Sequence, residues 1–238
     1  MYELGLYEKS MPNTLSFKEK LETVKATGFD FLEMSVDETD EKLARLEWTK
    51  EERLELLKTM YETGVSIRSM CLSGHRKYPF GSHDASVRER SMEIMEKAIE
   101  LADDLGIRVI QLAGYDVYYE EGDADTLEFF IDNLKKATLL AAQKGIVLGF
   151  ETMETPFMNT VEKSMRFVNL VDSPYLQVYP DSGNLKNASL EPGAKNVYED
   201  IELGKGHIVA AHLKETIPGH YREIPFGTGQ IDFKKMVD

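Results

Sequence analysis

One pattern repeats along the chain: a long amphipathic stretch, then a glycine, then a short apolar run rich in β-branched or aromatic residues. The four clearest copies are TGFDFLEMS, TGVSIRSMC, LGIRVIQLA and KGIVLGFET. Their glycines, Gly28, Gly64, Gly106 and Gly145, follow one another at intervals of 36, 42 and 39 residues. Each glycine is expected to end a helix in a left-handed conformation before the chain enters a strand. Repeats of this length predict parallel strands joined by helical crossovers.

Three further apolar runs extend the series to seven predicted strands: LGLY, LQVYP and HIVAAHL, the last from His207 to Leu213. Between the runs, Val87–Leu105 and Thr126–Gln143 have the periodicity of amphipathic helices. No glycine-rich dinucleotide fingerprint accompanies the repeats, so an α/β fold of the (β/α)8 or TIM barrel type is predicted over a doubly wound sheet. We expect one barrel domain over 1–238, truncated or incomplete at the C-terminus, because QIDFKKMVD resembles a seventh helix and the eighth strand is missing.

The balance of charges restricts the classes of partner. Acidic residues outnumber basic ones 42 to 28, which gives a formal net charge of −14 and disfavours nucleic acid. The one cysteine, Cys71, lies in an apolar run and cannot form an internal disulfide. Because the sequence shows neither a signal peptide nor a membrane span, we expect a cytoplasmic protein with no membrane partner.

Polar side chains follow the predicted strands, at the end of a barrel where active sites lie. They are Glu33, Ser35, Ser73, His75, Gln111, Glu151, Asp181 and His212. Among them Glu151, Asp181 and His212 stand out, because two carboxylates and an imidazole form a good site for a divalent cation. His207 competes with His212 but lies at the beginning of its run. The structural alternative is that Asp181, before SGN, only caps a turn or helix.

Longer segments carry a resemblance to a known family. They are LGLYEKSMP, GFDFLEMSVDETDEKLARL, MCLSGHRKYPFGS, GIRVIQLAGYDVYYEE, YPDSGN, GHIVAAHLKET and IPFGTGQIDF. Together they resemble the L-xylulose-5-phosphate (L-ribulose-5-phosphate) 3-epimerases of bacterial L-ascorbate utilisation and the related hexulose-6-phosphate isomerases. The resemblance covers nearly the whole chain.

This resemblance implies a xylose-isomerase-like barrel that holds a divalent metal with Glu, Asp, His and a second Glu. Three of these ligands correspond to Glu151, Asp181 and His212. The fourth would come from the eighth strand, on a glutamate after an apolar run about 15 to 30 residues beyond Asp238. The metal could be zinc, manganese, cobalt or magnesium, since all accept such ligands in varying degree.

The implied reaction is the 3-epimerisation of a ketopentose 5-phosphate, L-xylulose 5-phosphate to L-ribulose 5-phosphate. A proton beside a ketone leaves readily only if the enediolate is stabilised, which a metal can do as a Lewis acid. Inversion then needs one group to remove the proton and another to return it on the opposite face. We predict that Glu151 is both metal ligand and catalytic base, with the missing glutamate as its partner.

Four side chains are predicted to contact substrate. Glu154 follows Glu151 by three residues, and Lys214 continues the run beyond His212, where it could orient a substrate oxygen or serve only at the surface. His75 follows the third strand, and Arg222 lies in the loop PGHYREIPFGTGQ.

That loop is also the predicted phosphate site. Arg222 and the backbone amides of Gly227 and Gly229 would bind the phosphate, as loops in this part of a barrel often do. The alternative is that GTG simply makes a turn, and Arg76 and Lys77 after the third strand offer another anionic contact.

Two other functions remain open. An aldose–ketose isomerase would use the same metal and enediolate, and a non-catalytic sugar-phosphate-binding barrel would use the same pocket. A nuclease of the endonuclease-four type has the same ligand pattern, but the acidic balance disfavours it. We expect a small sugar phosphate as partner and a homodimer, the commonest assembly of soluble proteins.

Overall fold

The computed structural model describes residues 2–237, and its centre is a sheet of parallel strands. The sheet has six strands in the order β1-β2-β3-β4-β5-β6, so neighbours in sequence are neighbours in space. The strands are β1 (Gly5–Tyr7), β2 (Phe31–Val36), β3 (Ser66–Leu72), β4 (Val109–Ala113), β5 (Val147–Glu151) and β6 (Leu176–Tyr179). The predicted repeat of parallel strands with helical crossovers is confirmed.

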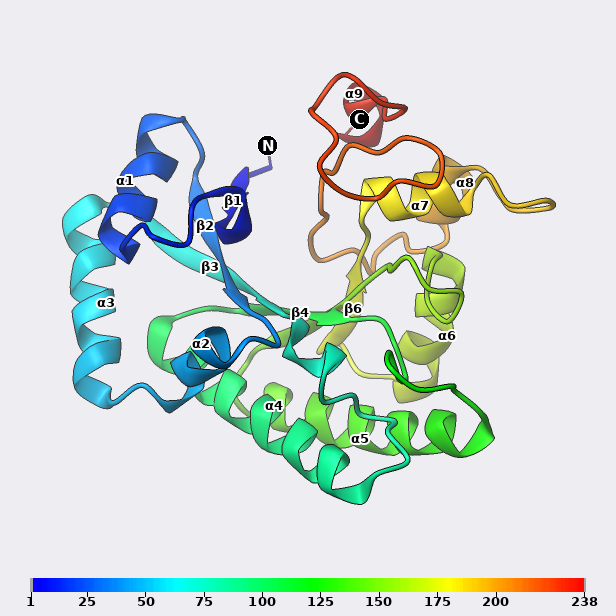
Figure 1. Ribbon diagram of the computed structural model, residues 1–238, viewed down its shortest axis with the longest axis horizontal. Coiled ribbons are helices and arrows are strands. Elements are labelled where there is room, and N and C mark those ends of the chain that lie inside the picture. Colours follow the sequence, from blue (N-terminus) through cyan, green and yellow to red (C-terminus); the bar gives the residue numbers. More distant parts are fainter. Residues whose placement is uncertain (1, 238) are drawn as a thin grey trace.

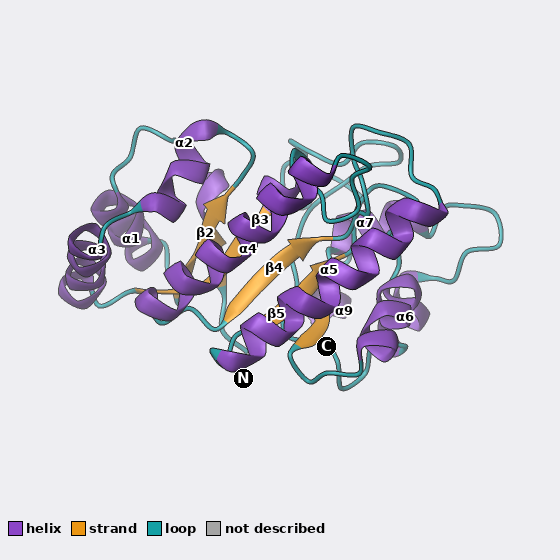
Figure 2. Ribbon diagram, turned by 90° about the horizontal axis from the view of Figure 1, so that it is seen from below, coloured by secondary structure: helices purple, strands orange, loops and turns teal. Residues whose placement is uncertain are grey.

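Helices cover the outer side of these strands. The α-helices are α1 (Phe17–Ala26), α2 (Asp40–Leu43), α3 (Lys50–Thr63), α4 (Ala85–Leu105), α5 (Ala124–Gln143), α6 (Val161–Val171), α7 (Ser182–Ala188), α8 (Val197–Glu202) and α9 (Phe233–Val237), and the 3-10 turns are η1 (Glu8–Ser10), η2 (Ala44–Glu47) and η3 (Ser73–Arg76). In Figure 1, α1, α3, α4, α5 and α6 form an arc around the strands, and Figure 2 shows α4 and α5 lying across β4 and β5. Within residues 2–237, no helix is long and apolar enough to cross a membrane.

The two long predicted helices are confirmed, and each begins two residues earlier than its apolar periodicity indicated. The reason is capping: the side chain of Asp84 accepts a hydrogen bond from the backbone of Ser86, and that of Asp123 from Asp125 and Thr126. Such caps satisfy backbone N–H groups that the first turn of a helix leaves unpaired.

The four glycines of the repeat have the left-handed conformation that the sequence predicted. Their φ angles are +79° at Gly28, +73° at Gly64, +75° at Gly106 and +65° at Gly145. At Gly106 a β-carbon would meet no atom within 4 Å. Conformation rather than space therefore requires glycine there.

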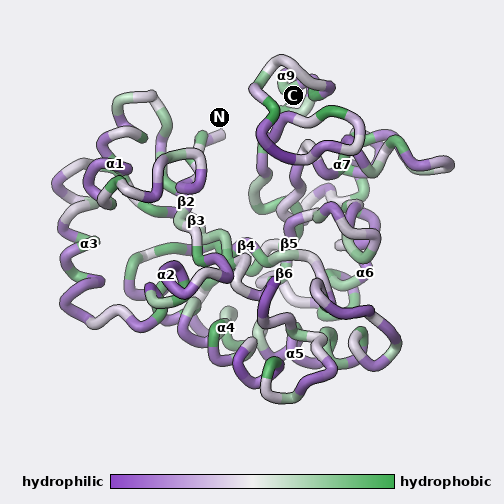
Figure 3. Tube along the Cα trace, in the orientation of Figure 1, coloured by the Kyte–Doolittle hydropathy of each residue, from purple (hydrophilic) through white to green (hydrophobic). Residues whose placement is uncertain are grey.

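Residues alternate in character along each strand. In β2, Leu32, Met34 and Val36 belong to the main hydrophobic core against the helices, whereas Glu33 and Ser35 lie on the opposite face. The same division recurs in the other strands, whose outward residues include Met70, Leu72, Ile110, Leu112, Leu148, Phe150, Leu176 and Val178. Figure 3 shows the strands as mixed green and pale segments, with hydrophilic stretches frequent in the outer helices and loops.

The strand register gathers the polar residues inside the curved sheet. Glu33 pairs with Ser69, and Ser35 with Cys71. Across a flat sheet, β2 and β6 would be about 19 Å apart, since neighbouring strands are spaced by about 4.8 Å. Nevertheless the Tyr179 hydroxyl of β6 donates a hydrogen bond to Glu33 of β2 at 2.8 Å. The sheet is therefore curled like a barrel wall, as the predicted TIM barrel requires.

The prediction of a seventh strand over His207–Leu213 is wrong, because this segment does not form a continuous strand. Two isolated parallel bridges, Val178 with Ile208 and Asp181 with His212, join this segment to the end of β6. The segment advances four residues between the bridges while its neighbour advances three, and Pro180 has no N–H to donate to a ladder. The bulge still brings His212 beside Asp181.

Candidate metal centre

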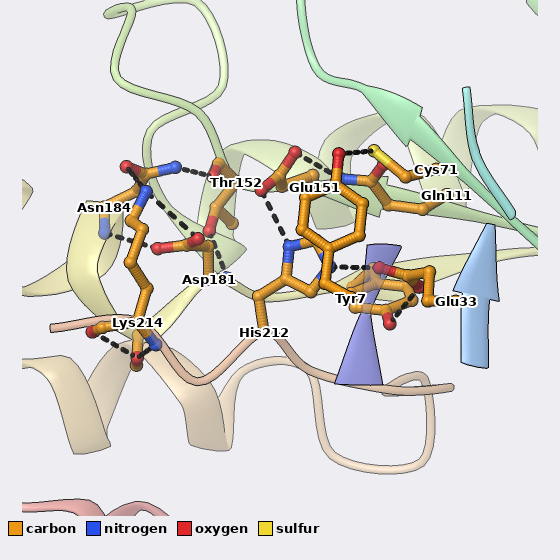
Figure 4. Close-up of polar contacts among 12 residues, drawn as sticks. Tyr7, Glu33, Cys71, Gln111, Glu151, Thr152, Asp181, Asn184, His212 and Lys214 are labelled. Atoms are coloured by element: carbon orange, nitrogen blue, oxygen red, sulfur yellow. Dashed lines mark hydrogen bonds and ion pairs between the residues drawn. The ribbon is translucent and has the colours of Figure 1, made fainter. Parts of the chain in front are cut away.

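Three of the predicted residues meet at the carboxyl ends of the strands. Glu151 is the last residue of β5, Asp181 follows β6, and His212 lies in the bridged segment. Each offers one ligand atom, and these atoms all lie within 4.8 Å of one another. Figure 4 shows the three side chains converging from separate elements. His207 lies elsewhere, with its Nδ1 3.1 Å from Gln177 Oε1.

Asp181 combines a structural and a site position. Its Oδ1 accepts a hydrogen bond of 2.8 Å from the backbone of Asn184 and so caps α7, as the structural alternative anticipated. Its Oδ2 lies 3.1 Å from Lys214 Nζ. Burial raises the pKa of Asp181, and the Glu151 carboxylate adds to this rise against the opposing charge of Lys214. Capping therefore leaves one carboxylate oxygen in the cluster.

His212 lies between two carboxylates. Its Nδ1 is 3.0 Å from Glu151 Oε1 and its Nε2 is 2.6 Å from Glu33 Oε1. Burial alone would lower the pKa of His212, but the charges and hydrogen bonds of Glu33 and Glu151 raise it well above its ordinary value. The protonated form of the imidazole, which this shift favours, partly neutralises the two carboxylates.

Glu151 is half-buried, and its pKa lies below the ordinary glutamate value. Burial raises its pKa, but His212, the charge of Lys214 and a hydrogen bond from the Gln111 side chain lower it overall. An ionised carboxylate offers lone pairs both to a cation and to a proton. Glu151 thus has the protonation state that a metal ligand or a base requires.

The charges of the cluster fit a bound cation. Three carboxylates, Glu33, Glu151 and Asp181, face two basic groups, His212 and Lys214, so negative charge is in excess. Buried excess charge is costly unless a counter-ion compensates it. Two carboxylates with one imidazole suit a divalent cation, and three protein ligands leave a coordination position open, as in catalytic sites.

Aromatic and sulfur groups line the same interior. The Tyr7 hydroxyl donates a hydrogen bond to Cys71 Sγ at 3.3 Å, and the Tyr7 ring centroid is 5.6 Å from that of His212. Burial, with the charge of Glu151, raises the pKa of the Cys71 thiol to about 12. Cys71 is therefore a buried, protonated thiol and a poor nucleophile.

A second polar cluster includes two of the predicted substrate contacts. The Arg76 guanidinium donates to the Tyr115 hydroxyl at 3.2 Å and lies 4.8 Å from the Tyr118 ring centroid. Its buried Nε has no hydrogen-bond partner among residues 2–237. Glu154 lies 3.5 Å from an Arg222 nitrogen, and its charge also acts on Arg76. Two guanidinium groups thus face one carboxylate.

The amides of the predicted phosphate loop already have a partner. Glu215, which is buried, accepts hydrogen bonds from the backbone of Gly227 at 3.0 Å and of Ile231 at 3.1 Å. At Gly229, a β-carbon would collide with the Thr216 carbonyl oxygen and the Glu215 carboxylate. The loop folds around an internal carboxylate, and the largely exposed Arg222 of the same loop is available to an external anion.

Comparison with known proteins agrees with this geometry. Residues 21–238 match the family model described as xylose isomerase-like TIM barrel. The chain is 47% identical, over 99% of its length and 81% of the relative's, to L-ribulose-5-phosphate 3-epimerase UlaE of Escherichia coli O139:H28. The chain belongs to the xylose isomerase-like TIM barrel family. The predicted resemblance and fold class are confirmed.

Solved structures of low sequence identity have the same fold. A 3-keto-D-glucoside 4-epimerase, YcjR, from E. coli aligns with a TM-score of 0.77 at 16% identity, over 100% of this chain and 86% of that one. An L-ribulose 3-epimerase aligns with a TM-score of 0.76 at 20% identity, over 99% and 76% of the two chains. At such identities these likenesses bear on the fold alone.

One predicted substrate contact, His75, lies apart from the cluster of Glu151, Asp181 and His212. His75 is buried in η3, with its ring centroid 4.5 Å from that of Phe80 and its Nε2 3.1 Å from the Ser91 carbonyl oxygen of α4. Burial lowers its pKa to about 4. Its neighbours here are core groups, and its contact with substrate stays a prediction.

Other interior residues were missed from the sequence. Tyr7, Ser69 and Tyr179 all reach the ligand cluster or its carboxylates. The available signal was the two-residue alternation of the strands, which places these residues on the same face as Glu33 and Glu151.

Proposed function

We propose that the protein is a metal-dependent 3-epimerase that interconverts L-xylulose 5-phosphate and L-ribulose 5-phosphate. The observation that carries this proposal is the convergence of Glu151, Asp181 and His212 within 4.8 Å at the carboxyl ends of the strands. Barrels of this type have their chemistry at that end. The activity named for the 47% identical relative supplies the substrate class.

Glu151, Asp181 and His212 would hold the divalent metal. When bound, the metal would stabilise negative charge on the enediolate as a Lewis acid. The donor set favours zinc, manganese or cobalt and also accepts magnesium. Lys214, now 3.1 Å from Asp181, can orient a substrate oxygen beside the ligands.

Glu151 would act as the base that removes the proton from C3. It is ionised, and its Oε1 is 3.0 Å from His212 while its other oxygen accepts from Gln111. These contacts hold the carboxylate in one orientation, which lowers the entropic cost of bringing it into a productive geometry with the substrate. We expect a second carboxylate, on a further strand of the barrel, to return the proton on the opposite face.

The second cluster would bind the anionic and hydroxyl groups of the sugar phosphate. Within residues 2–237 the buried Arg76 Nε has no hydrogen-bond partner, and Arg222 is exposed, so both guanidinium groups have donors for a phosphate. Glu154, which contacts Arg222, can accept a hydrogen bond from a sugar hydroxyl. Local positive charge of this kind attracts an anionic substrate despite the acidic net charge of the whole chain.

The test is NMR of L-xylulose 5-phosphate in deuterated water with the protein and each divalent metal in turn. We expect deuterium at C3 and the appearance of L-ribulose 5-phosphate, both lost in Glu151→Gln and after chelation. Deuterium only at C1 or C2, with an aldose product, would identify an isomerase instead. Binding without exchange under any metal would leave a non-catalytic sugar-phosphate-binding barrel.

Two further expectations accompany the enzyme. A homodimer is the commonest assembly of such proteins, and light scattering of the purified protein measures it directly. A cytoplasmic location suits a sugar-phosphate enzyme, and fractionation of cells that express the protein tests it.

A further inference from the structure

Glu33 is a buried carboxylate that the proposed mechanism does not use. It lies in β2, is 3% exposed, and is within hydrogen-bond distance of one of the ligands. Its Oε1 is 2.6 Å from His212 Nε2. Because β2 is far from His212 in sequence, only the curvature of the barrel brings the two together.

The other oxygen of Glu33 is fixed by two hydroxyl groups. Ser69 Oγ donates to Oε2 at 2.6 Å from β3, and the Tyr179 hydroxyl donates at 2.8 Å from β6. Contacts from β3, from β6 and from the segment that carries His212 therefore determine the direction of the Glu33 carboxylate. In Figure 4 Glu33 lies on the side of the imidazole away from Glu151 and Asp181.

This arrangement determines which nitrogen of His212 carries a proton. The Nε2 contact to Glu33 Oε1, at 2.6 Å, is shorter than the Nδ1 contact to Glu151 Oε1, at 3.0 Å, so a ring that gives up its Nδ1 proton to a metal keeps the N–H at Nε2. The neutral ring then has its lone pair at Nδ1, the nitrogen 3.0 Å from Glu151. The lone pair is thus directed at the space where the three ligand atoms converge.

We propose that Glu33 is a positioning residue, which holds His212 with Nε2 protonated and Nδ1 directed at the metal. The inference rests on the metal centre of the proposed function. A hydrogen bond from the second nitrogen of a ligating histidine to a carboxylate fixes ring orientation and increases ligand basicity, and its loss typically lowers metal affinity about 10- to 100-fold.

The neighbouring rings do not replace this contact. The Tyr179 ring centroid lies 4.9 Å from that of His212 and approaches it edge-on, and that of Tyr7 lies 5.6 Å away. These rings limit the volume in which the imidazole moves, but they form no hydrogen bond that distinguishes its two nitrogens. The contact to Nε2 comes from Glu33 instead.

The experiment measures Zn²⁺ affinity by competition with a chromogenic chelator, using the 238-residue chain and Zn²⁺ alone as probe. We expect Glu33→Ala to raise the Zn²⁺ Kd by about 10- to 100-fold. Glu33→Gln keeps an acceptor without its charge and should have an intermediate Kd. If the alanine variant does not fold, the glutamine variant carries the same test.

Asp200→Asn is the matched control. Asp200 is also buried, and its hydrogen bonds are with the backbone amides of Val161 and Glu162 at the start of α6. We expect this carboxylate-to-amide change to leave the Zn²⁺ Kd within about twofold, since it is separated from the ligands. A loss of affinity equal to that of Glu33→Gln would attribute the effect to general destabilisation and overturn the proposal.

A second readout is ¹⁵N NMR of histidine-labelled protein with Zn²⁺, with His212 assigned from the spectrum of His212→Gln. We expect zinc on Nδ1 and a proton on Nε2 in the wild type. Zinc on Nε2, or a Kd unchanged in both Glu33 variants, would overturn the role of Glu33 while leaving the metal centre intact. A wild type that binds no Zn²⁺, Mn²⁺, Co²⁺ or Mg²⁺ would overturn the metal centre itself.

Discussion

Two buried charge clusters lie at the carboxyl ends of the strands, and their charges have opposite signs. Around Glu8, just after β1, one carboxylate is surrounded by Lys20, Lys42 and Arg45, each within 2.7 Å. Around His212, the carboxylates Glu33, Glu151 and Asp181 outnumber the nearby cations. The first cluster has an excess of positive charge and the second an excess of negative charge.

The difference lies in how each carboxylate is satisfied. Glu8 accepts hydrogen bonds from all three basic side chains and from the backbone of Ser35 in β2. Its neighbours hold the pKa of Glu8 far below the usual range despite burial, which alone would raise it. The pKa of Asp181 is raised, because burial and the Glu151 carboxylate outweigh the opposing charge of Lys214. The Glu8 cluster is complete within the fold, whereas the cluster around His212 keeps an excess of negative charge and is incomplete in that sense.

The largest expected effect comes from the incomplete cluster. Glu151→Gln keeps the shape of the side chain but removes the charge that binds metal and takes the proton. We expect kcat/KM for C3 epimerisation to fall by about 10³-fold or more, in the upper part of the range for a general base. The measurement is the NMR assay with saturating metal, and activity within tenfold of the wild type would contradict the assigned role.

The complete cluster should respond in stability instead. Glu8→Gln leaves three buried basic groups without their anion, and removing one partner of a buried pair costs about 3–5 kcal/mol. We expect urea denaturation to show a loss of this size in the free energy of unfolding. Glu162→Gln, a change at an exposed ion pair with Lys195, is the control, with an expected loss below about 1 kcal/mol. Equal losses in both variants would remove the distinction.

The same cluster predicts a pH dependence. Because the folded-state pKa of Glu8 is depressed, its contribution to stability is present above the ordinary glutamate pKa of about 4.3 and is lost as the pH falls below it. The gap in unfolding free energy between wild type and Glu8→Gln should therefore be constant from about pH 6 to 8 and shrink in acid. Denaturation series at several pH values measure it, and a gap that widens in acid would reverse the sign.

Most of the strands and helices, and the three candidate metal ligands, could be predicted from the sequence. Local features could be predicted, whereas features that depend on pairing between distant segments could not. Glycine caps and the strand–helix period are local properties, so Gly28, Gly106 and the two long helices could be inferred directly. Glu151 and Asp181 followed from position at strand ends. The broken seventh strand depends on a one-residue bulge beside Pro180, which is a property of pairing between segments.

Other contacts depended on partners distant in sequence. Glu33 and His212 are separated by 179 positions, so nothing local indicates that they meet. The GTG loop has the composition of a phosphate site, but the sequence does not say which anion its amides bind, and Glu215 occupies them. His75 differs from the inward residues by its position in η3, where the turn directs its ring into the core.

Metal binding should change the free energy of unfolding by less than the Glu8→Gln substitution does. A ligand at about 100 times its Kd stabilises the folded state by about 2.7 kcal/mol. We expect Zn²⁺ or Mn²⁺ to increase the unfolding free energy of the wild type by about this amount, and chelation to reverse it. Glu8→Gln, although less stable, should gain a similar increment from the metal, because its cluster contributes no ligand. The absence of any increment in the wild type would contradict an incomplete cation site.

The smallest expected change in unfolding free energy is that of the Asp181→Asn variant without metal. Asparagine caps a helix about as well as aspartate, and Lys214 retains its hydrogen bond of 2.7 Å to Asn184. Removal of a buried charge beside Glu151 offsets the loss of the ion pair with Lys214. We therefore expect a change below about 1 kcal/mol in unfolding free energy without metal, together with loss of the metal increment. A loss of unfolding free energy as large as that of Glu8→Gln would mean that Asp181 serves mainly to stabilise the fold. A loss of that size is expected only where the charges of a cluster are already satisfied by other residues of the protein, as they are around Glu8.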